Sequence, residues 1–143
     1  MILLFSEVSI LRKLFKYISS VIVISFLIAA GATIIINKGL RRSSIDFYGK
    51  INTVNNPNAG INILLVGSSR TLVNINPQII DSVTHLRSYN SGLNAATIKT
   101  CYNIIVSAVQ NQAHLKTIVL NVDYNMFQPG RDPYKDPYYY AYT

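Results

Sequence analysis

A pair of serines follows a short apolar run near the middle of the chain. Residues 63–66 read Ile-Leu-Leu-Val and lead directly into Gly67, Ser68, Ser69 and Arg70. An uninterrupted run of branched apolar residues that ends in glycine is typical of a buried strand delivering its last residues to a sharp turn. A hydroxyl at such a turn could act as a nucleophile, provided that a general base lies within reach.

Strand and helix signals alternate around this turn. Besides 63–66, we expect strands at 86–90 and at 117–122, the last rich in β-branched residues. The intervening segments are long enough for helical crossovers. This order predicts the α/β fold class, with a parallel sheet covered by helices on both faces.

Two segments carry helix start signals. Asn76 followed by Pro77 predicts an N-cap and first helical residue, with the helix running to about Val83. Asn94 predicts the N-cap of a longer helix to about Ala113, whose apolar residues recur at three and four spacing. Three strands make a small sheet with an open edge, so we expect this segment to be part of a larger domain.

Polar residues follow each predicted strand. Ser68 and Ser69 follow the first, Gly92 the second, and Asp123 and Asn125 the third. Ligands of open α/β sheets bind beyond the carboxyl ends of the strands, so we expect these residues to converge on one pocket. The alternative is that they are ordinary turn residues, since Gly, Ser, Asn and Asp end strands in many proteins.

Three motifs occur in a suggestive order. They are Leu-Leu-Val-Gly-Ser-Ser-Arg at 64–70 with Asn-Pro-Gln-Ile-Ile-Asp at 76–81, Tyr-Asn-Ser-Gly at 89–92, and Ile-Val-Leu-Asn-Val-Asp-Tyr-Asn at 118–125. Over residues 61–127 the chain resembles the N-terminal portion of the SGNH (GDSL-like) hydrolases, particularly their membrane-anchored bacterial branch. The resemblance implies a partial three-layer, flavodoxin-like domain of SGNH type. It also implies an acyl-ester hydrolase or acyltransferase acting on acylated cell-envelope glycans.

The resemblance assigns a role to each motif. Ser69 matches the nucleophile, and Ser68 stands where the family has Asp. Gly92 and Asn125 match the oxyanion hole, although Asp123 stands where the family has Gly. These are suitable donor types, because a tetrahedral acyl intermediate needs N–H groups aimed at its oxyanion.

A general base is the part that these residues do not supply. The family takes its base from a late Asp-x-x-His motif, whereas this chain has Asp-Pro-Tyr-Lys at 132–135. His85 and His114 precede strands, which places them at the amino edge of the sheet, about 15 Å from Ser69 by strand rise. We therefore expect a truncated chain with little or no hydrolysis. The alternative is a non-catalytic cell-envelope binding or scaffold module.

Other residues near the turn have several interpretations. Ser68, Arg70 and Asp123 could contact substrate, but Arg70 could equally pair with Asp123 or lie in solvent. The turn lacks the spacing of a phosphate-binding loop. Cys101 is the only cysteine, which excludes disulfides and Cys-based zinc sites within one chain, and its setting favours a small buried hydrophobe over a reactive thiol. No metal or other cofactor is predicted.

The N-terminal third of the chain has the pattern of a membrane anchor. We expect a lead-in at 1–16, a transmembrane helix at 17–36, and a linker at 37–60, whose stretch 52–60 is rich in turn formers and should be irregular. A helix over the uncharged stretch 18–36 would span about 28 Å. A cleaved signal peptide, cut near 30–32, is the alternative.

The end of the chain, 128–143, is a tail with five of the ten tyrosines, either a surface loop or an aromatic binding platform.

The net charge of +7 is concentrated beside the apolar segment. Residues 1–50 hold seven Lys/Arg against two acidic residues, whereas the rest holds six against four. This distribution favours contact with anionic lipid over nucleic acid binding. Three basic residues lie on each side of the span, so charge does not orient it. The resemblance implies a single-pass protein of the bacterial cytoplasmic membrane with its domain outside. Oligomeric state stays open.

Overall fold

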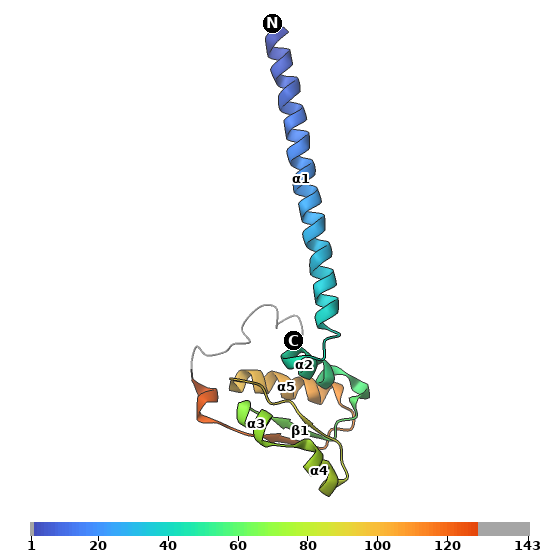
Figure 1. Ribbon diagram of the computed structural model, residues 1–143, viewed down its shortest axis with the longest axis vertical. Helices are drawn as coiled ribbons and strands as arrows, with labels where there is room; N and C mark the ends of the chain where they lie inside the picture. Colours follow the sequence, from blue (N-terminus) through green and yellow to red (C-terminus); the bar gives the residue numbers. More distant parts are fainter. Residues whose placement is uncertain (1, 129–143) are drawn as a thin grey trace. The chain divides into compact units, whose positions relative to one another are not determined.

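The structure, a computed structural model, describes the backbone of residues 2–128 and the side chains of residues 12–45 and 47–128. The chain divides into two compact units, and the boundary in the sequence lies between Leu40 and Arg41. The first unit is a single helix, α1 (Ile2–Leu40), drawn in blue in Figure 1. The predicted tail lies outside the described residues, apart from Gln128.

Helix α1 contains the predicted apolar span. Its segment Arg12–Leu40 is long and apolar enough to cross a membrane by length and composition. The large apolar side chains from Leu14 to Ile36 are exposed, as a helix surrounded by lipid requires. The helix is longer at both ends than the predicted 17–36, because no proline or other strong helix breaker interrupts 2–40.

The second unit contains a three-stranded parallel sheet. Strand β1 (Ile63–Val66) lies between β2 (Ser88–Asn90) and β3 (Thr117–Leu120). Leu64 pairs with Tyr89 on one side and with Ile118 on the other. The predicted parallel sheet is therefore confirmed; β1 has the expected bounds, whereas β2 and β3 are shorter than expected.

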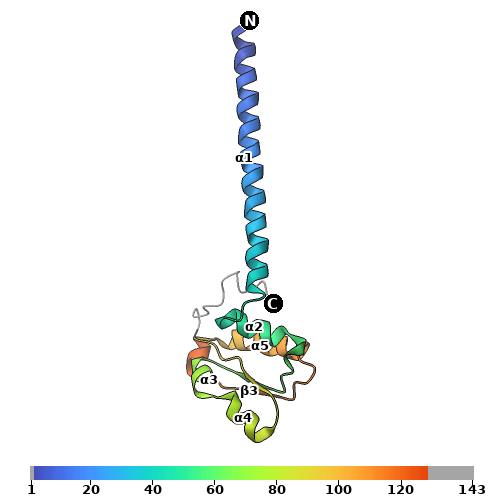
Figure 2. The same ribbon diagram turned by 45° about the vertical axis from the view of Figure 1, so that its right-hand side comes forward.

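Helices cover both faces of this sheet. In Figures 1 and 2, α2 (Asp46–Asn55) and α5 (Ile98–Asn111) lie on one face, and α3 (Ser69–Asn74) and α4 (Pro77–Thr84) lie on the other. Two short 3-10 turns, η1 (Pro57–Ala59) and η2 (Tyr124–Phe127), complete the described elements. The predicted cap of α4 is confirmed, since the Asn76 side chain accepts a hydrogen bond from the Gln78 N–H.

The main core lies between the sheet and the helix pair α2 and α5. Leu64 and Val66 point into it from β1, because side chains alternate along a strand. The other buried members come from the helices and loops and include Phe47, Ile51, Val54, Leu93, Cys101, Ile104, Ala108 and Met126. This core fixes β1, and with it the turn that carries the two serines.

Part of the predicted linker at 37–60 is helical, and residues 52–55 are not irregular as expected. Phe47, Ile51 and Val54 recur at helical spacing along α2 and are buried in the core. Gln112 holds the end of this segment: its Nε2 donates to the carbonyl oxygens of Val54 and Asn56, each at 2.7 Å. The α/β domain therefore includes α2 and begins well before the predicted residue 61.

The predicted start of the long helix is also wrong. Helix α5 begins at Ile98, and its N-cap is Thr97, whose side chain accepts a hydrogen bond from the Thr100 N–H. Asn94 instead precedes Ala95, which has a positive φ of 53°. The chain must turn there after leaving β2, so the helix cannot start at Asn94.

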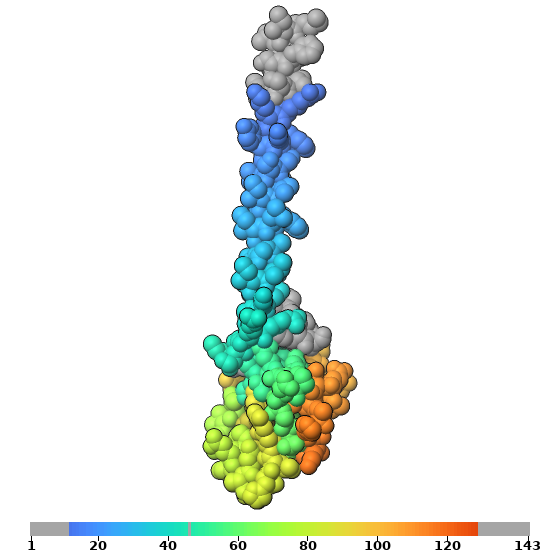
Figure 3. Space-filling model, turned by 90° about the vertical axis from the view of Figure 1, so that its right-hand side faces the viewer, coloured from blue at the N-terminus to red at the C-terminus, as the bar shows by residue number. Residues whose placement is uncertain are grey.

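Strand β3 forms an open edge of the sheet. Its outward side is unpaired within the described residues, and Val119 and Leu120 are exposed. Figure 3 shows the orange surface of this part of the chain along one side of the folded domain. The expectation of an open edge is confirmed.

Candidate functional site

The two serines occupy different positions at the start of α3. Ser68 is the N-cap: its Oγ accepts a hydrogen bond from the Arg70 N–H at 3.3 Å. Ser69 is the first helical residue and is exposed. Within the described part of the chain, neither its hydroxyl nor its N–H has a hydrogen-bond partner. Ser69 is therefore the serine whose hydroxyl is accessible to a ligand.

Gly67 allows the turn to fold back tightly on α3. A methyl group at this position would overlap the hydroxyl of Thr71 and lie 3.0 Å from the carbonyl oxygen of Asn121. Thr71 is fully buried, and its Oγ1 has no hydrogen-bond partner among the residues that the structure describes. The glycine is thus required by close packing between the turn, the helix and the end of β3.

The loop after β2 lies directly against this turn. The Leu93 N–H donates to the carbonyl of Gly67 at 3.1 Å. A methyl group at Gly92 would lie 2.6 Å from the backbone nitrogen of Leu72 in α3. The predicted approach of Gly92 to the serine turn is therefore present in the structure.

Asn90 organises the same loop and was missed in the sequence. Its Oδ1 accepts from the Gly92 N–H at 2.9 Å, and its Nδ2 donates to the carbonyls of Thr71 and Ile75, each at 2.8 Å. The Gly92 N–H, a predicted oxyanion donor, thus already has an acceptor. The sequence signals for Asn90 were its place at the end of a predicted strand and in the Tyr-Asn-Ser-Gly motif at 89–92.

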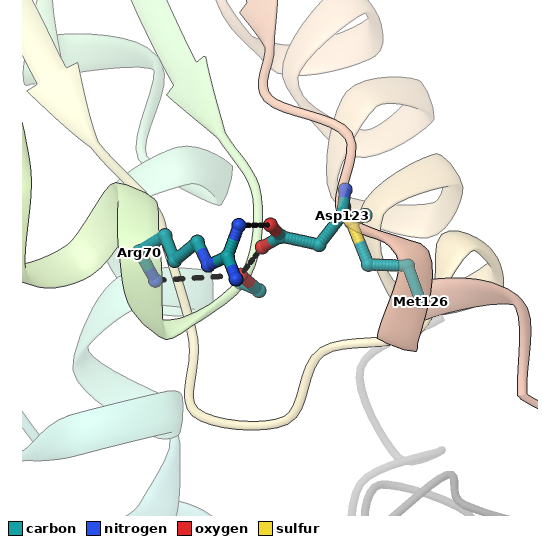
Figure 4. A network of polar contacts seen from close by, with 4 residues as sticks. Arg70, Asp123 and Met126 are labelled. Carbon is teal, nitrogen blue, oxygen red and sulfur yellow. Dashed lines mark hydrogen bonds and ion pairs between the residues drawn. The ribbon is translucent and has the colours of Figure 1, made fainter.

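Asp123 connects the third strand end to the first (Figure 4). Its Oδ2 accepts from the Ser68 hydroxyl, and its Oδ1 lies 3.0 Å from Nη1 of Arg70. The Asp123 side chain is 6% exposed, whereas that of Arg70 is 70% exposed. Of the alternatives for Arg70, the structure places it in an ion pair with Asp123, and this network engages both oxygens of the carboxylate.

Asn125 lies one turn further on, in η2. It is exposed, and its Oδ1 accepts from Gln128 Nε2 at 3.3 Å. Met126 beside it is buried in the core, and its sulfur lies 3.2 Å from the backbone nitrogen of Asp123. The predicted residues Ser68, Arg70 and Asp123 are thus in direct contact, whereas Ser69 and Asn125 are exposed beside them.

The two histidines lie at the other edge of the sheet. His85 caps the C-terminal end of α4 and His114 precedes β3, and both are exposed. Because all three strands are parallel, residues that precede them lie opposite the serine turn. The expected separation of both histidines from Ser69 agrees with this topology.

Lys50 brings a positive charge to the carboxyl edge of the sheet. Its Nζ donates to the backbone carbonyl of Asn90 at 2.8 Å. The residue belongs to α2, which lies within the predicted linker. Its helical spacing from the buried Phe47 and Val54 was the available signal.

Two other ionisable side chains are perturbed by burial. Burial raises the pKa of the Cys101 thiol to about 11. A thiol that stays protonated is a poor nucleophile, so the buried-hydrophobe interpretation of Cys101 agrees with the structure. Burial also raises the pKa of Tyr89, and a side-chain hydrogen bond with Thr53 partly opposes this shift.

The described residues contain no cluster of three or more His, Cys, Asp or Glu side chains that could hold a metal ion. No protein-family model, curated protein or solved structure matches the chain. The interpretation of the site consequently rests on its own residues and on the motif resemblance.

Proposed function

We propose that the domain carries the nucleophile half of an SGNH-like acyl-ester hydrolase or acyltransferase, with Ser69 as the nucleophile. The observation that carries this proposal is the difference in environment between the two serines of the turn. Ser68 is buried and bonded to Asp123, whereas the adjacent Ser69 is exposed and has no intramolecular partner among the described residues. The strand order β2-β1-β3 supports it, since flavodoxin-like sheets begin in this order.

In the proposed reaction, Ser69 Oγ attacks the ester carbonyl while an imidazole-type base accepts its proton. The Ser69 N–H and the Asn125 amide stabilise the oxyanion, and the Gly92 N–H joins them on exchanging its Asn90 acceptor. The alcohol leaves with the proton from the base. Water or an acceptor hydroxyl then releases the acyl group. The chain has two histidines, His85 and His114, and both lie at the opposite edge of the sheet, so the imidazole that accepts the proton comes from another molecule or from added imidazole.

The proposal places the domain at a bacterial cytoplasmic membrane, anchored through α1 and facing outward. The length and composition of Arg12–Leu40 support an anchor. The basic residues at both ends of the span, among them Lys16 and Lys38, suit contact with anionic lipid headgroups. Acylated glycans of the cell envelope are the proposed substrates, as the motif resemblance implies.

Phosphonylation by an alkyl fluorophosphonate tests the nucleophile. The full chain in detergent is incubated with the probe, with and without added imidazole, and adducts are located by peptide mass spectrometry. We expect a slow adduct on Ser69, accelerated by imidazole acting as the missing base. Ser69→Ala should abolish it. Ser82→Ala is the matched control, because Ser82 is also exposed on a short helix of this domain.

A non-catalytic cell-envelope binding module is the second candidate. Two observations favour it. The Gly92 N–H already donates to Asn90, so it is not free to bind an oxyanion, and both histidines lie at the opposite edge of the sheet from Ser69. This module predicts no Ser69 adduct, even with imidazole. Absence of the adduct from folded wild-type protein would therefore reject the acyl-transfer proposal and support the module.

A further inference from the structure

A single carboxylate holds the residues on both sides of Ser69. Asp123 accepts a hydrogen bond from the hydroxyl of Ser68 and forms an ion pair with Arg70. Ser69 has no such bond of its own among the described residues. Its position is therefore set through its two neighbours.

The same residue also starts the turn that presents Asn125. The Met126 N–H donates to the Asp123 carbonyl at 3.0 Å, and the Asp123 N–H faces the Met126 sulfur at 3.2 Å. Met126 is 1% exposed and belongs to the core. Asp123 and Met126 are therefore both fixed, one by the serine turn and one by the core (Figure 4), and Asn125 lies between them in the sequence.

The two arms of Asp123 differ in strength. The Arg70 side chain is largely exposed, so its ion pair is screened by water and contributes little to stability. The Ser68 hydroxyl is buried and donates to an ionised oxygen, which makes that bond the stronger one. A buried carboxylate without partners would cost free energy. The bonds from Asp123 to Ser68 and Arg70 therefore hold the residues after β3 against the start of α3.

We propose that Asp123 is a positioning residue that fixes the distance between Ser69 and Asn125. It acts on the proposed nucleophile through Ser68 and Arg70, and on the proposed oxyanion donor through η2. This role rests on the proposed function of Ser69. The motif comparison does not contain it, because the family has glycine at this position.

Asp123→Asn tests the role while preserving side-chain shape. We expect the rate of Ser69 phosphonylation, measured per folded molecule with imidazole present, to fall about tenfold or more. The reason is that small displacements of reacting groups from their productive geometry slow a reaction strongly. The matched control is Asp81→Asn. Asp81 also holds a serine, accepting from the N–H and the hydroxyl of Ser88 at 2.6 and 2.5 Å, but it does so at the start of β2.

The control separates positioning from stability. Asp81→Asn should raise the labelling rate of the buried Cys101, which reports opening of the domain, and leave the Ser69 rate per folded molecule unchanged. Hydrogen exchange provides a second readout: Asp123→Asn should raise exchange selectively at 69–72 and 124–127. A uniform rise across the domain would show that Asp123 only stabilises the fold.

Conservative replacement of Arg70 completes the test. Arg70→Lys keeps a cation beside the carboxylate and should retain the wild-type Ser69 rate, whereas Arg70→Gln should lower it modestly because this arm is exposed. A Ser69 adduct whose rate is unaffected by Asp123→Asn would overturn the positioning role alone. A wild-type protein without any Ser69 adduct would overturn the proposed function on which the role depends.

Discussion

Replacement of Gly67 by alanine should destabilise the domain through one identifiable contact. The added methyl group would overlap the Thr71 hydroxyl and approach both the Thr71 Cβ and the Asn121 carbonyl oxygen at 3.0 Å. Overpacking of this kind costs about 3 kcal/mol when the neighbours cannot move. Thr71 cannot move easily, because it is fully buried in the first turn of α3.

Thr71→Ala should relieve most of that cost. On its own the substitution removes a methyl group, which costs about 1 kcal/mol, and a buried hydroxyl that lacks a partner in the described part of the chain, whose removal gains about the same. Its net effect should therefore be close to zero. In the double variant the new methyl group occupies the space of the lost hydroxyl, so we expect a favourable coupling of about 2 kcal/mol. Thr71→Val is the matched control, because valine keeps the bulk and should give no relief.

Cys101 provides the assay for this cycle. It is the only cysteine and is fully buried, so a thiol reagent labels the chain only when the domain opens. The ratio of native to unfolded labelling rates gives the free energy of opening, and about 1.4 kcal/mol corresponds to a tenfold change. The double variant should thus label roughly thirtyfold more slowly than additive effects predict. Additivity within about 0.5 kcal/mol, or equal relief by Thr71→Val, would refute the packing argument.

Three further predictions use stability as the readout. Gln112→Ala should cost about 2 kcal/mol or more by urea unfolding, because it leaves the Val54 carbonyl and the Ile61 N–H without these partners and removes one of the two donors to the Asn56 carbonyl; a cost below about 1 kcal/mol would contradict the role of this side chain. Gly92→Ala should destabilise the domain and raise hydrogen exchange in α3, since the methyl group meets the backbone of Leu72, and no loss of protection in α3 would reject that contact. The raised pKa of Cys101 should make stability fall between pH 9 and 11. In that range the folded state keeps a proton that the unfolded state has lost, and the slope should reach about 1 kcal/mol per pH unit. Cys101→Ala should show a shallower decline in urea midpoints followed by far-ultraviolet circular dichroism, and equal slopes would count against the assigned cause.

The sheet could be predicted because its strongest signals lie within short stretches of the sequence. The run at 63–66 has no polar interruption, and the Asn76-Pro77 pair combines a cap with a residue suited to the first helical turn. Both signals require only neighbouring residues. The parallel arrangement then follows from the alternation of strands and helices.

Helix α2 could not be recognised with the same ease. Its last residues, 52–55, are Asn-Thr-Val-Asn, which are all weak helix formers. The helix is stabilised instead by burial of Phe47, Ile51 and Val54 against α5, a partner more than forty residues away. Tertiary packing overrides a weak local propensity here, and the spacing of the three apolar residues was the signal that could have shown it.

The choice between two caps at the start of α5 has a similar cause. Asn94 and Thr97 are both suitable N-caps by residue type. The Leu93 N–H is bonded to Gly67, so the chain is held at the serine turn immediately before Asn94. It needs the next residues, including the left-handed Ala95, to turn toward the helix. A contact between distant loops thus decides where the helix begins.

The assignment of roles to Ser68 and Ser69 depends on a contact that the sequence separates by more than fifty residues. Either serine could cap a helix, and successive residues at a helix start point about 100° apart, so only one can face the end of β3. Asp123 engages Ser68, and the same rotation then turns Ser69 toward solvent. The Asp123 carboxylate therefore determines which serine of the turn is accessible: it accepts from the Ser68 hydroxyl, and the Ser69 hydroxyl remains exposed.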